Sequence, residues 1–192
     1  MKTEIIRLRS RDRNEVERFA DLRCGEDQSL YKFRGGFKRE DIVVGGMAEL
    51  AVYRFLKAKG VKVKRPNFKI IGKAKKSYEA DLTDGTKHFH VKGQSLNSAA
   101  KYGNSWLMQR NDPLVNNVEL NHYLVPTEVN LRTNEIKILC LPSFSALHHF
   151  QVFMDCKVDW FNKTKTAIYL DSLMFLSHDA RWGVLRKRRI TK

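Results

Sequence analysis

Hydrophobic residues recur at helical spacing in two segments near the start of the chain. A short apolar stripe runs through residues 10–23, and Ser10 can cap that helix. A longer stripe runs through residues 40–59, and Gly60 supplies a stop. The pattern predicts two helices, and residues 24–37, with three glycines, are expected to form a loop between them.

The rest of the chain shows shorter apolar runs that are typical of strands. Strands are expected at residues 61–64, 68–71, 121–126, 135–141, 157–160 and 166–170. Residues 96–110 look like a loop that becomes helical around Trp106, and Ser143 can cap a helix over residues 143–151. This order of helices and strands predicts an α/β (α+β) layer in one compact domain.

Residues 77–92 predict a β-hairpin around Asp84 and Gly85, a strong two-residue turn signal. The pairs that this turn sets opposite each other are Thr83 and Thr86, Asp81 and His88, Glu79 and His90, and Ser77 and Lys92. Alternate residues share a face, so carboxylates, imidazoles and an ammonium group meet on one face. Such groups bind divalent metals and stabilise charge on phosphorus, but a solvated, salt-bridged hairpin shows the same alternation.

Glu49 adds a carboxylate from the second predicted helix. It sits between Ala48 and Val52, at the border of the apolar stripe, where a carboxylate is better placed in a cleft than in the core. Gly45 and Gly46 precede it by one turn, and each costs the helix about 1 kcal/mol relative to Ala, which indicates a close backbone approach. The alternative is an ordinary Glu favoured by the helix dipole.

Lys and Arg outnumber Asp and Glu by 36 to 21, and the excess is concentrated in two segments. Residues 57–76 hold nine Lys or Arg and residues 181–192 hold six, and neither segment contains an acid. The other 160 residues carry 21 basic and 21 acidic side chains, so the formal charge of +15 comes from these two segments. Nucleic acid is the leading partner, because phosphate neutralisation supplies most non-specific affinity. Solubility alone is the alternative, although it would not require clustering.

Other features narrow the class of protein. The three cysteines are odd in number and far apart, which favours a reducing compartment. Their spacing does not match that of cysteines that bind zinc in a knuckle. No window reaches about 18 uninterrupted apolar residues, and the N-terminus lacks the apolar core of a signal peptide. No Walker motif or Rossmann fingerprint is present. We therefore expect a cytoplasmic protein with no membrane partner and no nucleotide-driven chemistry.

The order of these residues resembles the PD-(D/E)xK nuclease superfamily, which has the restriction-endonuclease-like fold. The family pattern is a helical Glu, a strand Asp, and (D/E)-x-K in the partner strand. Glu49, Asp81 and His90-Val91-Lys92 fill these places here. The resemblance covers about residues 40–150 and implies a central mixed sheet flanked by helices.

The resemblance also implies a division of the chain within one compact domain. Residues 1–37 would be an N-terminal helix and arm, residues 38–150 the nuclease core, and residues 151–192 a C-terminal extension with a basic tail. The resemblance is consistent with a protein encoded by a bacterium, a phage or a mobile element. A homodimer is left open, because one site cuts one strand at a time.

The activity that the resemblance implies is Mg²⁺-dependent endonuclease hydrolysis of DNA, which leaves 5′-phosphate ends. Asp81 would be the central metal ligand, Glu49 would hold the metal directly or through water, and the Val91 carbonyl would complete the coordination. Lys92 would position or activate the attacking water. Side chains expected to support these groups or to contact DNA are Gln94, Glu79 and His88. Phosphate contacts are expected from Lys73, Lys75, Lys76, Arg186, Lys187, Arg188 and Arg189.

His90 departs from the family pattern, which usually has a carboxylate at that position. Imidazole is a poorer ligand for Mg²⁺ than for Mn²⁺, so Mn²⁺ is an alternative cofactor. His90 is then a substitute ligand or general base, or Glu79 supplies the missing carboxylate, or the site is degenerate and the protein only binds DNA. A basic RNA-binding protein is a weaker alternative.

Overall fold

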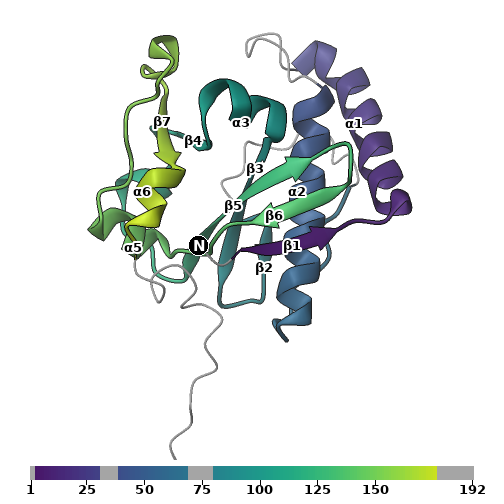
Figure 1. Ribbon diagram of the computed structural model, residues 1–192, viewed down its shortest axis with the longest axis horizontal. Helices are drawn as coiled ribbons and strands as arrows, with labels where there is room; N and C mark the ends of the chain where they lie inside the picture. Colours follow the sequence, from purple (N-terminus) through teal and green to yellow (C-terminus); the bar gives the residue numbers. More distant parts are fainter. Residues whose placement is uncertain (1–2, 31–38, 69–79, 177–192) are drawn as a thin grey trace, which may run out of the picture.

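The computed structural model describes residues 3–30, 39–68 and 80–176, together with their side chains except those of residues 26–30. Within these residues a curled five-stranded sheet has two long helices on one side and a layer of short elements on the other (Figure 1). The fold is therefore mixed α+β, with a central mixed sheet flanked by helices as expected from the sequence.

The two long helices are α1 (Ser10–Leu30) and α2 (Arg39–Ala58). The predicted cap at Ser10 is wrong, because Asp12 reaches back and accepts the Arg9 N–H at 2.9 Å, which makes Ser10 the first residue of the helix. The predicted loop is also wrong over its first part, since α1 continues through Cys24, which packs against the main core. The second helix matches its prediction, and Gly60 follows it with φ +81°.

One of the two paired glycines brings the helices close together. A Cβ on Gly46 would lie 2.7 Å from Cγ1 of Val16 on α1, whereas a Cβ on Gly45 would meet nothing within 4 Å. The expectation of a close approach is confirmed for Gly46 and is wrong for Gly45. A Cβ on Gly93 would meet Val44 of α2 at 3.1 Å, so a second glycine lets the sheet approach the same helix.

The large sheet has the strand order β1-β6-β5-β3-β2. Its strands are β1 (Glu4–Arg7), β2 (Leu82–Thr83), β3 (His88–Ser95), β5 (His122–Asn130) and β6 (Glu135–Ile138). The central pair β3 and β5 is parallel and the other pairs are antiparallel. The predicted strands at 121–126 and 135–141 are confirmed.

The expected strand at residues 61–64 is absent, because its backbone groups bond locally. The Val61 N–H donates to Leu56 O at 2.9 Å, and the Val63 N–H donates to Val61 O at 3.0 Å. Residues 61–68 are instead held by Arg65, which makes two hydrogen bonds of 2.7 and 2.5 Å to Glu15 of α1. Of the expected strand 68–71, only residue 68 lies within the described residues, and it is not in a strand.

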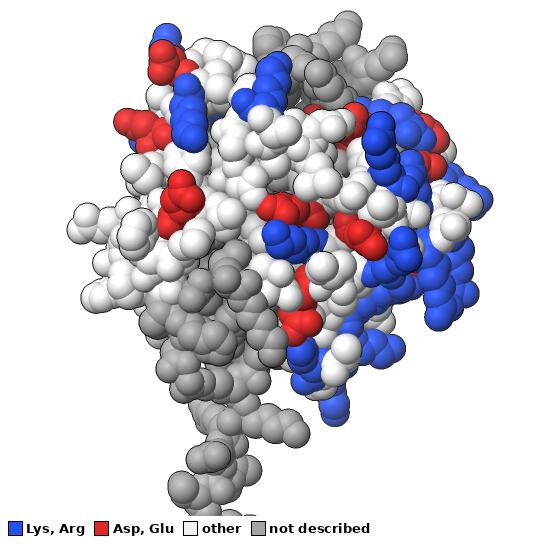
Figure 2. All heavy atoms as spheres, in the orientation of Figure 1, with Lys and Arg blue, Asp and Glu red and all other residues white. Residues whose placement is uncertain are grey.

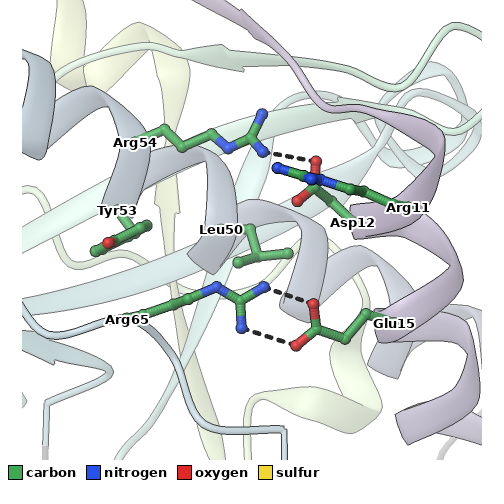
Figure 3. A pocket seen from close by; sticks show the side chains of 7 residues that line it. All are labelled: Arg11, Asp12, Glu15, Leu50, Tyr53, Arg54 and Arg65. Atoms are coloured by element: carbon green, nitrogen blue, oxygen red, sulfur yellow. Dashed lines mark hydrogen bonds and ion pairs between the residues drawn. The ribbon is translucent and has the colours of Figure 1, made fainter.

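A cavity of about 400 Å³ lies where this segment meets α1 and α2 (Figure 3). Three arginines line it together with acidic side chains, and two of the three are paired. Besides the Arg65–Glu15 pair, Arg54 of α2 bonds Asp12 of α1 at 2.7 Å. These ion pairs join α1 to α2 and to the 61–68 segment.

The second layer contains the antiparallel pair β4 (Ser105–Gln109) and β7 (Lys165–Tyr169) and the short helices α3 (Leu96–Tyr102), α4 (Pro113–Asn116), α5 (Phe144–His149), α6 (Leu170–Met174) and η1 (Asp159–Phe161). The prediction for residues 96–110, a loop that becomes helical around Trp106, is wrong. Ser95 caps a helix at the start of this range, and Trp106 lies in a strand. The strand expected at 157–160 is wrong, since η1 begins there. The strand at 166–170 and the helix capped by Ser143 are confirmed.

Two apolar clusters fill the space on either side of the large sheet. One cluster joins α1 and α2 to residues such as Phe89 and Val91 of β3, and the other joins β4, α5 and α6 to Leu124 of β5. Successive residues of β3 therefore point into different layers, as the period of a strand requires. By the same alternation, the candidate side chains His88, His90, Lys92 and Gln94 share the face of β3 that is opposite Phe89 and Val91.

Two surface properties complete the description of the fold. None of the helices among the described residues is long and apolar enough to cross a membrane. Lys and Arg side chains gather along the side of the molecule that α1 and α2 occupy, whereas the opposite side shows fewer of them, mixed with acidic side chains near its upper end in this view (Figure 2).

Candidate active site

The hairpin that carries the candidate site has a different register from the predicted one. Leu82 pairs with Phe89 and Thr83 pairs with His88, which places Asp81 opposite His90 rather than His88. The turn is longer than the predicted two residues because the Asp84 carboxylate accepts hydrogen bonds from the N–H groups of residues 86 and 87, at 3.0 and 2.7 Å. The shift is two residues, so it keeps the alternation of faces.

Asp81 lies directly before β2, and its side chain replaces one hydrogen bond of the strand pair. Its Oδ2 accepts the Val91 N–H at 2.7 Å. Because the N–H and C=O of one strand residue point to the same side, the Val91 carbonyl is directed toward the edge where Asp81 lies. The carboxylate and the carbonyl are thus two oxygen donors at one edge of β3.

Glu49 approaches this edge from α2. The pKa of Glu49 is raised to about 8, mainly by burial and secondly by the charge of Asp81, although the charges of Arg23 and Lys92 lower it. Residue Asp81 is exposed, but its carboxyl group is turned toward β3, and desolvation there raises its pKa against the charge of Lys92 and the Val91 N–H. The structure therefore brings Glu49, Asp81 and Lys92 within electrostatic reach of one another.

His90 is directed away from these carboxylates. Its imidazole is only 6% exposed, shares a hydrogen bond of 2.9 Å between its Nε2 and Nδ1 of His122, and packs edge-on against Phe144 of α5. Burial lowers the pKa of His90 to about 3, with further contributions from the charges of His122, Lys92 and His88. His90 is therefore neutral near pH 7 and packs in the layer opposite α2.

His122 is a residue that sequence reasoning missed. It stacks on His88 with ring centroids 4.6 Å apart, and its Nε2 lies 3.7 Å from Oε2 of Glu119. Burial is the main cause that lowers its pKa. The parallel register sets His122 beside His88, and only this long-range pairing connects it to the hairpin. His88, which is expected to support the site or to contact DNA, packs on this histidine.

Gln94 uses both ends of its amide on the backbone. Its Nε2 donates to Gly103 O at 2.9 Å, and its Oε1 accepts the Ser105 N–H at 3.0 Å. These bonds fix the connection between α3 and β4. Several other predicted site residues lie outside the described residues, namely Glu79, Lys73, Lys75, Lys76, Arg186, Lys187, Arg188 and Arg189.

The donor set suits a hard divalent cation in part. Mg²⁺ is commonly held by one or two carboxylates, with waters and substrate phosphates filling the other positions. Glu49, Asp81 and the Val91 carbonyl supply oxygen donors of this kind. A cation would offset the desolvation that raises the pKa of both carboxyl groups and the repulsion by Asp81 that adds to the shift of Glu49. Within the side chains of residues 3–25, 39–68 and 80–176, no three His, Cys, Asp or Glu residues converge into a metal-ligand group.

Comparison of the chain with protein-family models, with curated proteins and with solved structures returned no match. The chemistry of the site is therefore argued from its own residues and geometry.

Proposed function

We propose that this protein is a divalent-metal-dependent endodeoxyribonuclease with a restriction-endonuclease-like core, which hydrolyses DNA to 5′-phosphate ends. The observation that carries the proposal is that Glu49 of α2, Asp81 just before β2 and Lys92 of β3 lie within electrostatic reach of one another. In this arrangement the two carboxylates can bind a metal, and the ammonium group can position a water and offset charge on a phosphate.

Each group has a specific role in the proposed reaction. The Val91 N–H orients the Asp81 carboxylate, and Asp81, Glu49 and the Val91 carbonyl would hold Mg²⁺, which polarises the scissile phosphate when bound. The Lys92 ammonium positions the attacking water and offsets the negative charge that develops on phosphorus. Water attacks in line, the bond from phosphorus to O3′ breaks, and a 3′-hydroxyl and a 5′-phosphate are released.

The placement of His90 favours a supporting role. Its hydrogen bond to His122 and its contact with Phe144 hold β3 against β5 and α5, which positions Lys92 two residues later. Mg²⁺ is the favoured cation, because the donors near the edge of β3 are oxygens. Mn²⁺ would be preferred if the His90 imidazole were a ligand, but that imidazole packs against His122 and Phe144.

The proposal is tested with supercoiled plasmid DNA, incubated with Mg²⁺ or Mn²⁺ and with EDTA as the blank. We expect wild type to cleave, and Asp81→Asn and Lys92→Ala to lose at least about 100-fold in rate, since even outer-shell changes at metal sites cost 10- to 100-fold. Asp171→Asn, an exposed carboxylate on α6, is the matched control and should cleave normally. Equal cleavage by wild type and both site variants would reject the assignment.

A DNA-binding module without catalysis is the second candidate. The burial of His90 where the family has a carboxylate favours it, as does the lack of a three-residue ligand group among the described side chains. It predicts tight, salt-dependent DNA binding with no cleavage in any divalent metal. The plasmid assay separates the two candidates.

A further inference from the structure

Trp160 presents an aromatic surface on the layer opposite α1 and α2. It lies in η1 and is 70% exposed. Its ring packs on Phe161 with the centroids 3.7 Å apart and the planes inclined by 32°. One side of the indole is thus supported by protein, and most of the side chain remains accessible to a flat partner.

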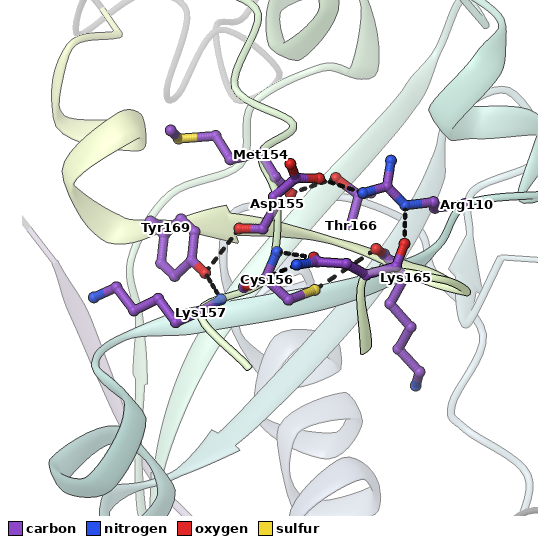
Figure 4. Close-up of polar contacts among 9 residues, drawn as sticks. Arg110, Met154, Asp155, Cys156, Lys157, Lys165, Thr166 and Tyr169 are labelled. Carbon is purple, nitrogen blue, oxygen red and sulfur yellow. Dashed lines mark hydrogen bonds and ion pairs between the residues drawn. The ribbon is translucent and has the colours of Figure 1, made fainter. Parts of the chain in front are cut away.

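Lysines lie beside the aromatic rings in this region. Nζ of Lys165 is 5.7 Å from the centroid of Phe161, and Nζ of Lys157 is 5.1 Å from the centroid of Tyr169. In Figure 4 the side chains of both lysines extend away from the hydrogen bonds that their backbone atoms make. Residues 157–165 contain three lysines and one acid, Asp159.

The segment that carries these residues is held firmly (Figure 4). The Tyr169 hydroxyl accepts the Lys157 N–H at 2.8 Å and donates to Asp155 O at 3.1 Å. The Nε–H of Arg110, the residue directly after β4, donates to Asn162 O at 2.7 Å. A surface fixed in this way loses little conformational entropy when it binds a ligand.

Contacts connect this segment to the candidate active site. Gln94, two residues after Lys92 on β3, bonds Gly103 and Ser105, and Ser105 pairs with Tyr169 of β7. A Cβ on Gly103 would lie 3.4 Å from Nζ of Lys157. Lys101 and Tyr102 precede Gly103, with the ammonium 4.9 Å from the ring centroid and Tyr102 44% exposed. We name this set the aromatic–lysine strip, which consists of Lys101, Tyr102, Lys157, Trp160, Phe161, Lys165 and Tyr169.

The composition of the strip fits one kind of ligand. Aromatic rings bind the faces of unstacked bases, and interleaved cations pair with the phosphates between them. In duplex DNA the base faces are already stacked and are not accessible to a side chain. A protein partner would use the rings but would gain less from the lysines.

We propose that the aromatic–lysine strip binds a single-stranded segment of the DNA substrate next to the cleavage site, with a base stacked on Trp160 and phosphates beside Lys157 and Lys165. The proposal rests on the nuclease function proposed above and specifies its substrate as DNA that contains an unpaired segment.

Binding is measured by tryptophan fluorescence in EDTA, so that no cleavage occurs. The probes are oligo(dT) of about 12 nucleotides, within the site sizes of about 4–16 known for single-strand binders, a blunt duplex of the same length, and oligo(U). The background is a Trp182→Phe variant, which leaves buried Trp106 and exposed Trp160. We expect oligo(dT) to quench the emission, and the duplex to quench it much less.

Variants assign the effect to the strip. Trp160→Ala should weaken oligo(dT) affinity, followed by anisotropy, by about 5- to 100-fold, and Trp160→Phe should retain most of it. Lys157→Gln should weaken binding, and Arg132→Gln in the β5–β6 turn is the charge control. Phe150→Ala on the end of α5, an aromatic residue 45% exposed outside the strip, is the aromatic control. Unchanged binding by Trp160→Ala, or tighter binding of oligo(U) than oligo(dT), overturns the proposal.

The same samples separate this proposal from the nuclease function. If plasmid cleavage depends on Asp81 while Trp160→Ala binds and cuts a gapped substrate normally, the strip proposal fails and the nuclease stands. If no metal supports cleavage but Trp160 is required for oligo(dT) binding, the nuclease fails and the binding surface stands.

Discussion

At the residue scale, the environment of Glu49 gives the site a definite pH dependence. Its folded pKa of about 8 is higher than the ordinary glutamate value of 4.5, so the folded state binds a proton more tightly than the unfolded state. The stability that this proton contributes is complete below about pH 4.5 and is lost as the pH rises through 8. Metal binding needs the deprotonated carboxylate and therefore improves over the same range.

We expect Glu49→Gln to remove this pH dependence. In EDTA, the unfolding free energy of wild type relative to Glu49→Gln should fall by on the order of 2–4 kcal/mol between pH 5 and pH 8.5. Urea unfolding curves at several pH values measure the difference, and titrating groups that do not interact with Glu49 cancel because both proteins contain them. A difference that stays constant with pH would show that Glu49 is not desolvated.

The hydrogen bond between the buried imidazoles has a measurable effect on stability. His122→Ala leaves Nε2 of the buried His90 without its partner, which should cost about 1–3 kcal/mol. His149→Ala changes an exposed histidine on α5 and should cost less than about 0.5 kcal/mol. Urea denaturation compares the two, and equal small effects would mean that the imidazole pair does not stabilise the fold.

At the element scale, the sequence predicted the elements in which a hydrophobic pattern continues over many residues. It missed the helix start and the strand register that are decided by single side-chain hydrogen bonds. The pattern for α2 and the strands β5 and β6 was sufficient, because each buries a continuous face. The register of the hairpin depended on side-chain bonds of Asp84, and the start of α1 on a bond of Asp12 to Arg9. Hydrophobic periodicity carries no information about such bonds.

The paired glycines of α2 provide a matched test of helix packing. Gly45→Ala should stabilise the protein by up to about 1 kcal/mol, because its Cβ meets open space and Ala favours the helix. Gly46→Ala should destabilise it by about 1–2 kcal/mol, because its Cβ meets buried Val16 at 2.7 Å. Thermal melts of both variants check the opposite signs. Stabilisation by both would show that α1 can move away from α2.

At the scale of the whole molecule, the candidate site depends on contacts between distant parts of the chain. The sequence identified Glu49, Asp81 and Lys92 from their order, and the structure places them within electrostatic reach. It could not place His90, because the direction of that imidazole depends on His122 and Phe144, which come later in the chain. Which face of a strand meets which layer is decided only when the layers assemble.

The salt dependence of DNA binding should increase with the number of Lys and Arg residues that neutralise phosphates. The logarithm of the DNA binding constant should fall linearly with the logarithm of salt concentration, by about 0.9 for each phosphate neutralised. Replacing the six Lys and Arg residues of the 181–192 segment with Gln should reduce this slope by up to about 5. Fluorescence anisotropy against NaCl concentration measures it. An unchanged slope would exclude that segment from the DNA contact.

The hydrogen bond from the Val91 N–H to Asp81 makes one backbone amide a reporter of the site. Protonation of that carboxylate, or its coordination to a cation, changes the charge that this N–H senses at 2.7 Å. In a ¹H–¹⁵N NMR spectrum the Val91 resonance should therefore move in a titration with acid or with Mg²⁺. The occupancy of the carboxylate pair could be followed at a main-chain position, with every side chain of the candidate site left intact.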